Sequence, residues 1–298
     1  MKYTSLFEEH KKLKAKIVPF AGYQMPVTYK KIIEEYEAVR NNCGMFDVSH
    51  MGQLKITGRD SEIFLQKITL NNVIKLHNYE AQYSAMCNFE GGLIDDLIIF
   101  KISKIEYIII VNASNKKNVI EWMKKYNSLE DLNIKDMNQD YSLIALQGPQ
   151  SKTYINSIAN NAMDIKFYNL QKIQLLDEDV IISRTGYTGE LGYEILGTHD
   201  SIRKIWNYFI KNNVQPAGLA VRDVLRMEMK YCLYGNDINS KINPLEAGLS
   251  WIIDFSKTDF IGKDKLLDIK IKGYKQKLVG FIMLEKAIPR SKYSIHLD

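Results

Sequence analysis

The feature that most constrains this chain is a glycine pair followed by an apolar run with two carboxylates at its start, Gly91-Gly92-Leu93-Ile94-Asp95-Asp96-Leu97. The glycines predict a turn, and the run that continues beyond them predicts a buried strand. Because side chains alternate along a strand, Asp95 shares a face with Leu97, whereas Asp96 shares one with Ile98. We therefore expect two separated carboxylates rather than a dyad. At least one of them enters apolar surroundings, where an unpaired charge is costly.

The composition indicates a globular protein with room for a large core and two or more domains. Of its 298 residues, 46% are hydrophobic and 25% are charged, which excludes a disordered or fibrous chain. No apolar run approaches the roughly 18 residues of a membrane span, and no secretory peptide is visible. A cytoplasmic protein that does not bind a membrane is therefore expected, although a processed mitochondrial matrix protein would look similar.

The cysteines and the net charge narrow the classes of site. Cys43, Cys87 and Cys232 lie far apart, which argues against a disulfide framework and against a zinc site. No second histidine lies at metal-ligand spacing from His50, so we expect no metal. The net charge of +5 is mild, and the lysines are scattered. Nucleic acid is therefore a weakly supported partner, and an acidic protein or an anionic small molecule suits the charge equally well.

Periodicity predicts strands and helices in mixed order, with hairpins in place of regular βαβ crossovers. This order is typical of an antiparallel α+β fold. Near the end of the chain, residues 277–283 are strand-like and residues 293–295 could start another strand. The predicted strands cover residues 53–57, 83–87, 93–102, 107–111, 141–147, 180–184 and 193–196, and the predicted helices cover 29–40, 60–67, 115–126, 151 onward, 201–211 and 220–231.

Two local motifs have a plain structural interpretation. Gly186–Gly192 lacks the spacing of a dinucleotide loop and is followed by a strand, so a turn between strands is favoured over a phosphate site. Ser49 and His50 are adjacent, which points their side chains apart, and no nucleophile elbow occurs. A catalytic triad is therefore not expected, and His50 alone is more often structural than catalytic.

Two arginines leave two interpretations open. Arg222 and Arg226 lie one turn apart on a predicted helix, where the commonest explanation is a solvated basic face. The alternative is a pair that grips carboxylates, which the guanidinium fork binds bidentately. Glu194 lies on a predicted strand, where a lone glutamate is usually solvated.

Taken together, eight strings in order make the chain resemble a known family. The resemblance is to the aminomethyltransferase, or T-protein, family of the glycine cleavage system, whose members bind folate, and it covers essentially the whole chain. The strings are Phe20–Pro26, Phe46–Gly52, Gly91–Leu97, Leu146–Pro149, Arg184–Glu190, Ala220–Leu225, Tyr234-Gly235 and Asn243–Gly248.

The resemblance implies a fold of two antiparallel-sheet folate-binding subdomains with flanking helices, followed by an incomplete C-terminal β-barrel. Subdomain one would comprise residues 1–50 and 139–250, and subdomain two residues 51–138. Residues 251–298 would form a linker and the truncated start of the barrel. Family members are longer and supply a further folate-contacting arginine, so the resemblance implies weaker folate affinity here and an exposed apolar edge.

The resemblance also implies a reaction and its partners. An aminomethyl group on the lipoyl-lysine arm of the H-protein would be transferred to tetrahydrofolate as co-substrate. The products would be methylenetetrahydrofolate, ammonia and the dihydrolipoyl arm. Scattered lysines could meet an acidic partner and steer the encounter.

Site residues follow from the family by position. Asp95 matches the catalytic carboxylate, which would orient folate and stabilise cationic character as the one-carbon unit leaves sulfur, whereas Asp96 would be a structural neighbour. Glu194 matches a glutamate that hydrogen-bonds the pterin, and Arg222 a substrate-binding arginine. The remaining expected pocket residues are Met51, Tyr83, Val111 and Tyr187.

Other activities are compatible with parts of the pattern. A related folate-dependent demethylase departs from the paired aspartates, and oxidising relatives carry a flavin domain ahead of this module. A folate-binding, non-transferase relative of iron–sulfur or tRNA maintenance carries a Lys-Gly-Cys string that is absent here. A pure binding module for nucleic acid predicts affinity that weakens steeply with salt.

Overall fold

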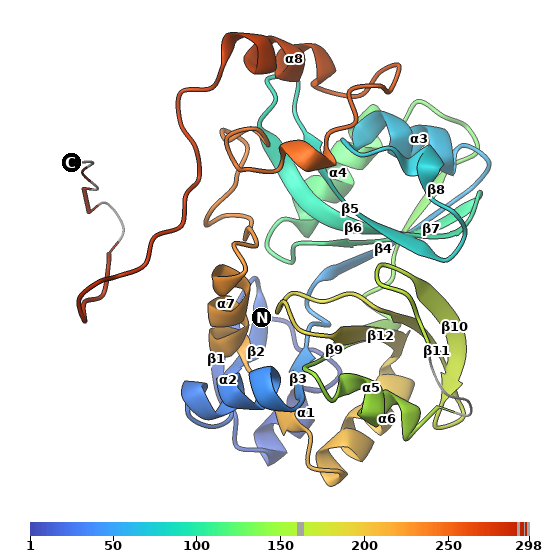
Figure 1. The fold of residues 1–298 in the computed structure, drawn as a ribbon. Helices are drawn as coiled ribbons and strands as arrows, with labels where there is room; N and C mark the ends of the chain where they lie inside the picture. The colour runs from blue at the N-terminus through green and yellow to red at the C-terminus, as the bar shows by residue number, and fades with distance from the viewer. Residues whose placement is uncertain (160–163, 291–292, 295, 297–298) are drawn as a thin grey trace.

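The structure is a computed structural model that describes residues 1–159, 164–290, 293, 294 and 296. Its framework is two antiparallel sheets that lie one above the other in Figure 1, with helices against their outer faces. The predicted α+β class with two antiparallel sheets and flanking helices is therefore confirmed. The boundaries predicted for the subdomains stay a prediction.

The lower sheet of Figure 1 has six strands in the order β10-β11-β12-β9-β3-β13. All neighbours are antiparallel except the short pair of β13 and β3. Its strands are β3 (Gly44–Asp47), β9 (Tyr141–Gln147), β10 (Leu170–Leu175), β11 (Glu178–Ser183), β12 (Gly192–Thr198) and β13 (Gln215–Pro216).

The upper sheet has five strands in the order β5-β6-β7-β4-β8, and every pairing is antiparallel. A separate hairpin near the N-terminus joins β1 (Lys16–Phe20) to β2 (Tyr23–Thr28). The strands of the upper sheet are β4 (Gly52–Thr57), β5 (Glu80–Cys87), β6 (Leu93–Ser103), β7 (Glu106–Val111) and β8 (Asn133–Asp136).

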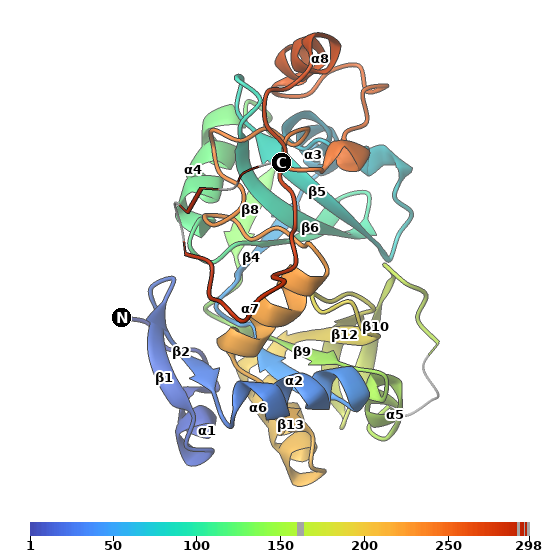
Figure 2. The ribbon, with the colours of Figure 1, turned by 60° about the vertical axis from the view of Figure 1, so that its left-hand side comes forward.

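The helices cover the outer faces and flank the junction of the sheets. In Figures 1 and 2, α5 and α6 lie against the lower sheet, α3 and α4 against the upper sheet, and α7 beside the junction. The helices are α1 (Phe7–Lys12), α2 (Ile32–Asn41), α3 (Ser61–Ile68), α4 (Lys116–Tyr126), α5 (Ser151–Asn156), α6 (His199–Lys211), α7 (Leu219–Glu228) and α8 (Lys263–Lys272), with short 3-10 turns at Val73–Lys75 and Ser250–Ile252.

The hairpin of β5 and β6 forms where the glycine pair predicts it. Gly91 has φ +82°, a left-handed conformation that favours glycine. A Cβ on Gly92 would lie 1.9 Å from the main-chain oxygen of Ser240, so the second glycine permits close packing of a distant loop. The turn closes with a hydrogen bond from the Asn88 amide to the Gly92 carbonyl at 2.8 Å.

Alternation along β6 divides its side chains between two cores. Leu97 and Ile99 belong to the core that includes Phe64 of α3. Phe100 belongs to a second core between the sheets, which includes Phe46 of β3. The predicted faces are therefore confirmed for the apolar part of the strand.

The C-terminal segment differs from the sequence-based prediction. Residues 277–283 were expected to be a strand, but no strand occurs between residues 274 and 290, so this prediction is wrong. An extended segment needs a neighbouring strand to pair its backbone groups. Among the described residues, this segment makes one backbone hydrogen bond to the rest of the chain, from the Leu278 amide to the Glu246 carbonyl at 2.8 Å. Figure 2 shows the segment descending from α8 past α7. Of the possible strand start at 293–295, Ile295 lies outside the described residues.

A buried ion pair attaches the N-terminal segment to the lower sheet. His10 of α1 and Asp47 of β3 meet at 2.8 Å with both side chains fully buried. Thr4 donates to Asp47 at 2.6 Å, and Tyr29 contacts the other ring nitrogen of His10 at 2.8 Å. Burial by itself would raise the pKa of Asp47, but the bonds and charge of its partners outweigh burial and lower it to about 2.

We predict that Asp47→Asn lowers the free energy of unfolding by about 3 kcal/mol at pH 7, since it breaks a buried pair. Because the folded pKa is depressed, the stabilisation is present above about pH 4 and is lost as the pH falls toward about 2. Chemical denaturation at several pH values measures both effects, with the exposed Asp200→Asn as the control. Equal stability of the two variants would contradict the prediction.

Candidate active site

Tyr83 and Asp96 lie on the face of the upper sheet that looks toward the lower sheet. Asp96 of β6 is opposite Ala85 of β5, and Tyr83 lies two residues along on the same face. The Tyr83 hydroxyl donates to Asp96 Oδ2 at 2.9 Å. The Tyr83 ring stacks with the ring of Trp251, with centroids 5.7 Å apart.

The two carboxylates meet at a single asparagine. Asn112, which follows β7, donates from Nδ2 to Asp95 Oδ1 at 2.9 Å and to Asp96 Oδ1 at 2.8 Å. Its main-chain amide also donates to Asp95 Oδ2 at 3.0 Å. The expectation of separated carboxylates is therefore wrong in part. The strand directs them to opposite faces, but the side chain of Asn112 at the end of the neighbouring strand reaches both.

Burial changes the acidity of this pair. Burial raises the pKa of Asp95 well above its usual value, and the charge of Asp96 raises it further. Burial also raises the pKa of Asp96, which the hydrogen bonds from Tyr83 and Asn112 oppose. Two neighbouring carboxyls with raised pKa values can hold and move a proton, which is the usual property of an acid–base site.

Arg222 of α7 lines the cleft, a cavity described below, together with Met51 and Asn112. Its guanidinium lies 4.5 Å from the centroid of the Tyr187 ring and donates to the sulfur of Met51 at 3.6 Å. The positive charge of Arg222 lowers the pKa values of Asp96 and Glu194, which indicates that all three are within electrostatic reach. The interpretation of a solvated basic face is therefore wrong for this arginine.

Arg226 has a different surrounding. It is 6% exposed and forms ion pairs with Asp223 at 2.7 Å and with Asp237. The carboxylates that Arg226 binds are therefore Asp223 and Asp237 of this chain, and the second of these ion pairs holds the loop after α7 to the helix.

Glu194 lies on β12 of the lower sheet, opposite Ser183. Its Oε2 accepts a hydrogen bond from the Thr185 hydroxyl, and no hydrogen bond reaches Oε1 from the part of the chain that is described. Burial raises the pKa of Glu194, against the opposing effect of Thr185 and Arg222. The expectation of a solvated strand glutamate is therefore replaced by a partly buried carboxylate with one available oxygen.

Val111 is not brought to this cleft. Its side chain is fully buried in the core beneath α3 and α4, together with Leu97. Its partner in the sheet is Gly52, where an added Cβ would lie 2.5 Å from the valine methyl group. The proposed role for Val111 is thus not supported by side-chain contact with the other residues.

The loop of residues 186–192 joins β11 to β12, in agreement with the prediction of a connection between strands. Gln147 explains two of its glycines, because a Cβ on Gly186 or Gly192 would lie 2.0 or 2.3 Å from the glutamine amide. The loop also carries Tyr187, whose hydroxyl donates to the carbonyl of Cys232.

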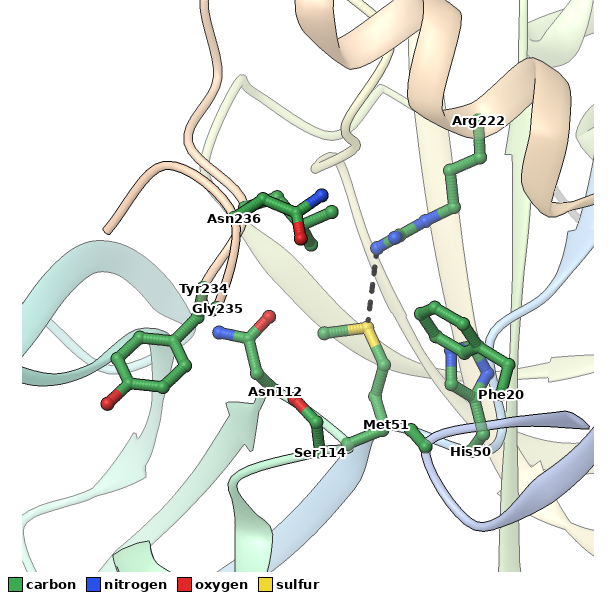
Figure 3. A pocket seen from close by; sticks show the side chains of 12 residues that line it. Phe20, His50, Met51, Asn112, Ser114, Arg222, Tyr234, Gly235 and Asn236 are labelled. Carbon is green, nitrogen blue, oxygen red and sulfur yellow. Dashed lines mark hydrogen bonds between the residues drawn. The ribbon is translucent and has the colours of Figure 1, made fainter. Parts of the chain in front are cut away.

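A cavity of about 270 Å³ opens beside the carboxylate pair. Figure 3 shows Arg222 above Met51, with Asn112 on the opposite wall and His50 beneath Phe20. The cavity is lined by Phe20, Ala21, His50, Met51, Asn112, Ala113, Ser114, Arg222, Leu233, Tyr234, Gly235 and Asn236.

Sequence reasoning missed Asn112 and undervalued His50 and Asp96. Asn112 lies after a strand with no motif around it, and only its contacts reveal it. His50 is buried, with no hydrogen-bond partner at Nδ1 among the described residues, and burial followed by the charge of Arg222 lowers its pKa to about 4. The family match gives Asp96 only a structural role, but strand alternation places it on the same face as Tyr83.

Two absences are limited to the described residues. Within them, no group of three or more His, Cys, Asp or Glu side chains is arranged to hold a metal ion. Over the same residues, no helix combines the length and the apolar character that crossing a bilayer requires.

Comparison with known proteins agrees with this fold. The family described as the GCVT N-terminal domain matches residues 6–257, so the chain is a GCVT-domain protein. A protein of Halothermothrix orenii called aminomethyltransferase is 45% identical, over 99% of this chain and 84% of its own length. An aminomethyltransferase of Thermosipho melanesiensis is 44% identical, over 100% of this chain and 82% of its own.

A solved structure gives the same result. It is a glycine cleavage system aminomethyltransferase T from Bartonella henselae, which superposes with a TM-score of 0.86 at 30% identity. The match covers 91% of this chain and 75% of that one. The chain belongs to the aminomethyltransferase family of the glycine cleavage system, and the prediction of that enzyme class is confirmed.

We predict that Tyr83→Phe raises the pKa of Asp96 further, because the hydroxyl donates to the charged carboxylate. Titration of ¹³C-labelled aspartate carboxyls by NMR measures this change. Tyr79→Phe is the control, since Tyr79 is exposed. An unchanged titration in Tyr83→Phe, or the same change in the control, would remove this hydrogen bond from the site.

Proposed function

We propose that this chain transfers the aminomethyl group from the lipoyl-lysine arm of an H-protein to tetrahydrofolate, with release of ammonia. The observation that carries the proposal is the arrangement of the cleft. Asp96 of the buried carboxylate pair on the upper sheet and the partly buried Glu194 of the lower sheet lie within electrostatic reach of Arg222. Family membership supports the same activity.

The side chains around the cleft suit tetrahydrofolate as co-substrate. The available carboxylate oxygen of Glu194 can accept from the adjacent amino and ring N–H groups of a pterin. Tyr187, Tyr83 and Met51 offer flat or polarisable surfaces for the rings. Arg222, already over the Tyr187 ring, offers a guanidinium to the anionic parts of folate.

The carboxylate pair suits the charge that develops. The aminomethyl carbon breaks its bonds to sulfur and to nitrogen and forms bonds to N5 and N10 of folate. The two protons released from N5 and N10 go to the sulfur and to the departing ammonia, so the reaction balances without an oxidant. Cationic iminium character arises on the way, and a fixed, dry carboxylate stabilises it.

We assign different tasks to the two carboxylates. Asp95, the residue indicated by the family match, binds Asn112 through both oxygens. Asp96 lies on the same strand face as Tyr83, and the positive charge of Arg222 lowers the pKa of Asp96. This geometry supports direct contact with the reacting carbon by Asp96, with Asp95 acting through Asn112. We retain both in the catalytic unit.

The proposal also includes a macromolecular partner, the subdomain boundaries and the location of the protein. An H-protein would be the macromolecular partner, and proximity of the two bound reactants would supply much of the rate. We keep the subdomain boundaries at residues 1–50 with 139–250, and at 51–138. The cytoplasmic location and the lack of a nucleic-acid partner stay predictions.

We predict that Asp96→Asn lowers kcat by about a hundredfold or more, the usual effect of losing a group that stabilises transition-state charge. Asp95→Asn should reduce it by about tenfold, because its effect passes through Asn112. Folate-dependent ammonia release from aminomethylated H-protein measures both variants.

The exposed Asp140→Asn is the control for a lost surface carboxylate. A greater loss in Asp95→Asn would return direct contact to Asp95. Unchanged rates in both variants would remove the pair from the mechanism, and no ammonia release by the unmodified chain would contradict the proposed function.

A further inference from the structure

Asn112 occupies the point where the carboxylate pair meets the cavity. It follows β7 directly and precedes α4, so two regular elements position its main chain. Its side chain is half-buried, and it lines the cavity together with Met51 and Arg222. No sequence motif contains it, and the proposed function uses it only as the link through which Asp95 acts.

All hydrogen-bond donors of Asn112 are directed away from the cavity. The Nδ2 group donates to Asp95 Oδ1, to Asp96 Oδ1 and, at 3.2 Å, to the Asp96 carbonyl, while the main-chain amide donates to Asp95 Oδ2. Because every one of these partners is an acceptor, the amide nitrogen has to face them. The orientation of the side chain is therefore determined by the two aspartates.

The amide oxygen is left for the cavity. Figure 3 shows it turned toward Met51 and Asn236, on the side away from the amide nitrogen. Within the described residues, no hydrogen bond reaches this oxygen. A half-buried carbonyl without a partner is an acceptor that a ligand can use.

We propose that Asn112 is a positioning and recognition residue of this site. Its amide nitrogen donates to both carboxyl groups and fixes their positions, and its amide oxygen accepts a hydrogen bond from a primary ammonium in the cavity. This assignment rests on the proposed function, in which the ammonium is that of the aminomethyl group on the lipoyl-lysine arm.

The charges around the cavity favour such a ligand at this wall. An ammonium has three donors and no acceptor, so it suits a wall that presents a carbonyl oxygen next to carboxylates. Arg222 lines the other side of the cavity and repels a cation toward Asn112. His50 also lines the cavity, and with a pKa of about 4 it is neutral at pH 7 and adds no competing positive charge.

Two variants separate the tasks of the nitrogen and the oxygen. Asn112→Ala removes both, whereas Asn112→Asp keeps an oxygen in place but loses the donor. Since donation by Asn112 lowers the pKa values of both aspartates, each variant should raise them. The acid limb of kcat/KM should then move to higher pH in both.

The KM for aminomethylated H-protein should rise about tenfold in Asn112→Ala and remain close to the unmodified value in Asn112→Asp. The exposed Asn207→Asp on α6, which adds the same charge away from the carboxylate pair, is the control and should change neither quantity. Thermal unfolding of every variant shows whether it folds.

A readout without turnover keeps the inference independent of the proposed function. NMR titration of ¹³C-labelled aspartate carboxyls in the full chain follows the pair directly. Unmoved titrations and an unmoved acid limb in folded Asn112→Ala would overturn the positioning task, and an equal KM would overturn recognition. If the unmodified chain releases no ammonia, the proposed function fails, and with it the carrier ammonium as ligand, while the titration still decides the positioning task.

Discussion

The burial of two adjacent carboxylates in β6 is the constraint on which the rest of the site depends. Asp95 is fully buried and Asp96 is 9% exposed, in a strand whose continuation is core. Such burial is tolerable only with partners, and Asn112 and Tyr83 provide them. The hairpin turn before the strand pairs β6 with β5 and so places Tyr83 beside Asp96, and the loop after β7 places Asn112 beside both carboxylates.

The second requirement is a facing wall, which comes from distant parts of the chain. The core between the sheets joins β6 and β7 to β3, β9 and β12. This packing sets α7, and with it Arg222, beside Tyr187 and within reach of Asp96. The N-terminal hairpin contributes Phe20 to the cavity, and the buried pair of His10 with Asp47 attaches its surroundings to the lower sheet.

Local patterns predicted the longer elements, because an apolar period reports on burial by a regular structure, but they missed the strands β1, β2, β3, β8 and β10 and the helices α1 and α8. The strand at 141–147 and the hairpin around Gly92 formed as expected. The strand at 277–283 did not form, since propensity cannot supply a neighbouring strand. In the site, the alternation of side chains is a property of a single strand. It therefore could not predict that Asn112, which follows the neighbouring strand β7, binds both Asp95 and Asp96. Arg222 looked solvated because its cover, Tyr187, lies 35 residues earlier in the chain. Motif resemblance indicated Glu194, whereas the periodicity of its strand could not.

The central claim is that the cleft binds folate through Glu194, the partly buried carboxylate of the lower sheet. Titration of the full chain with tetrahydrofolate by calorimetry, using the unmodified protein, Glu194→Gln and the exposed Glu130→Gln, tests it most directly. The account predicts affinity reduced about tenfold or more in Glu194→Gln and unchanged in Glu130→Gln. Equal affinity of all three proteins would contradict it.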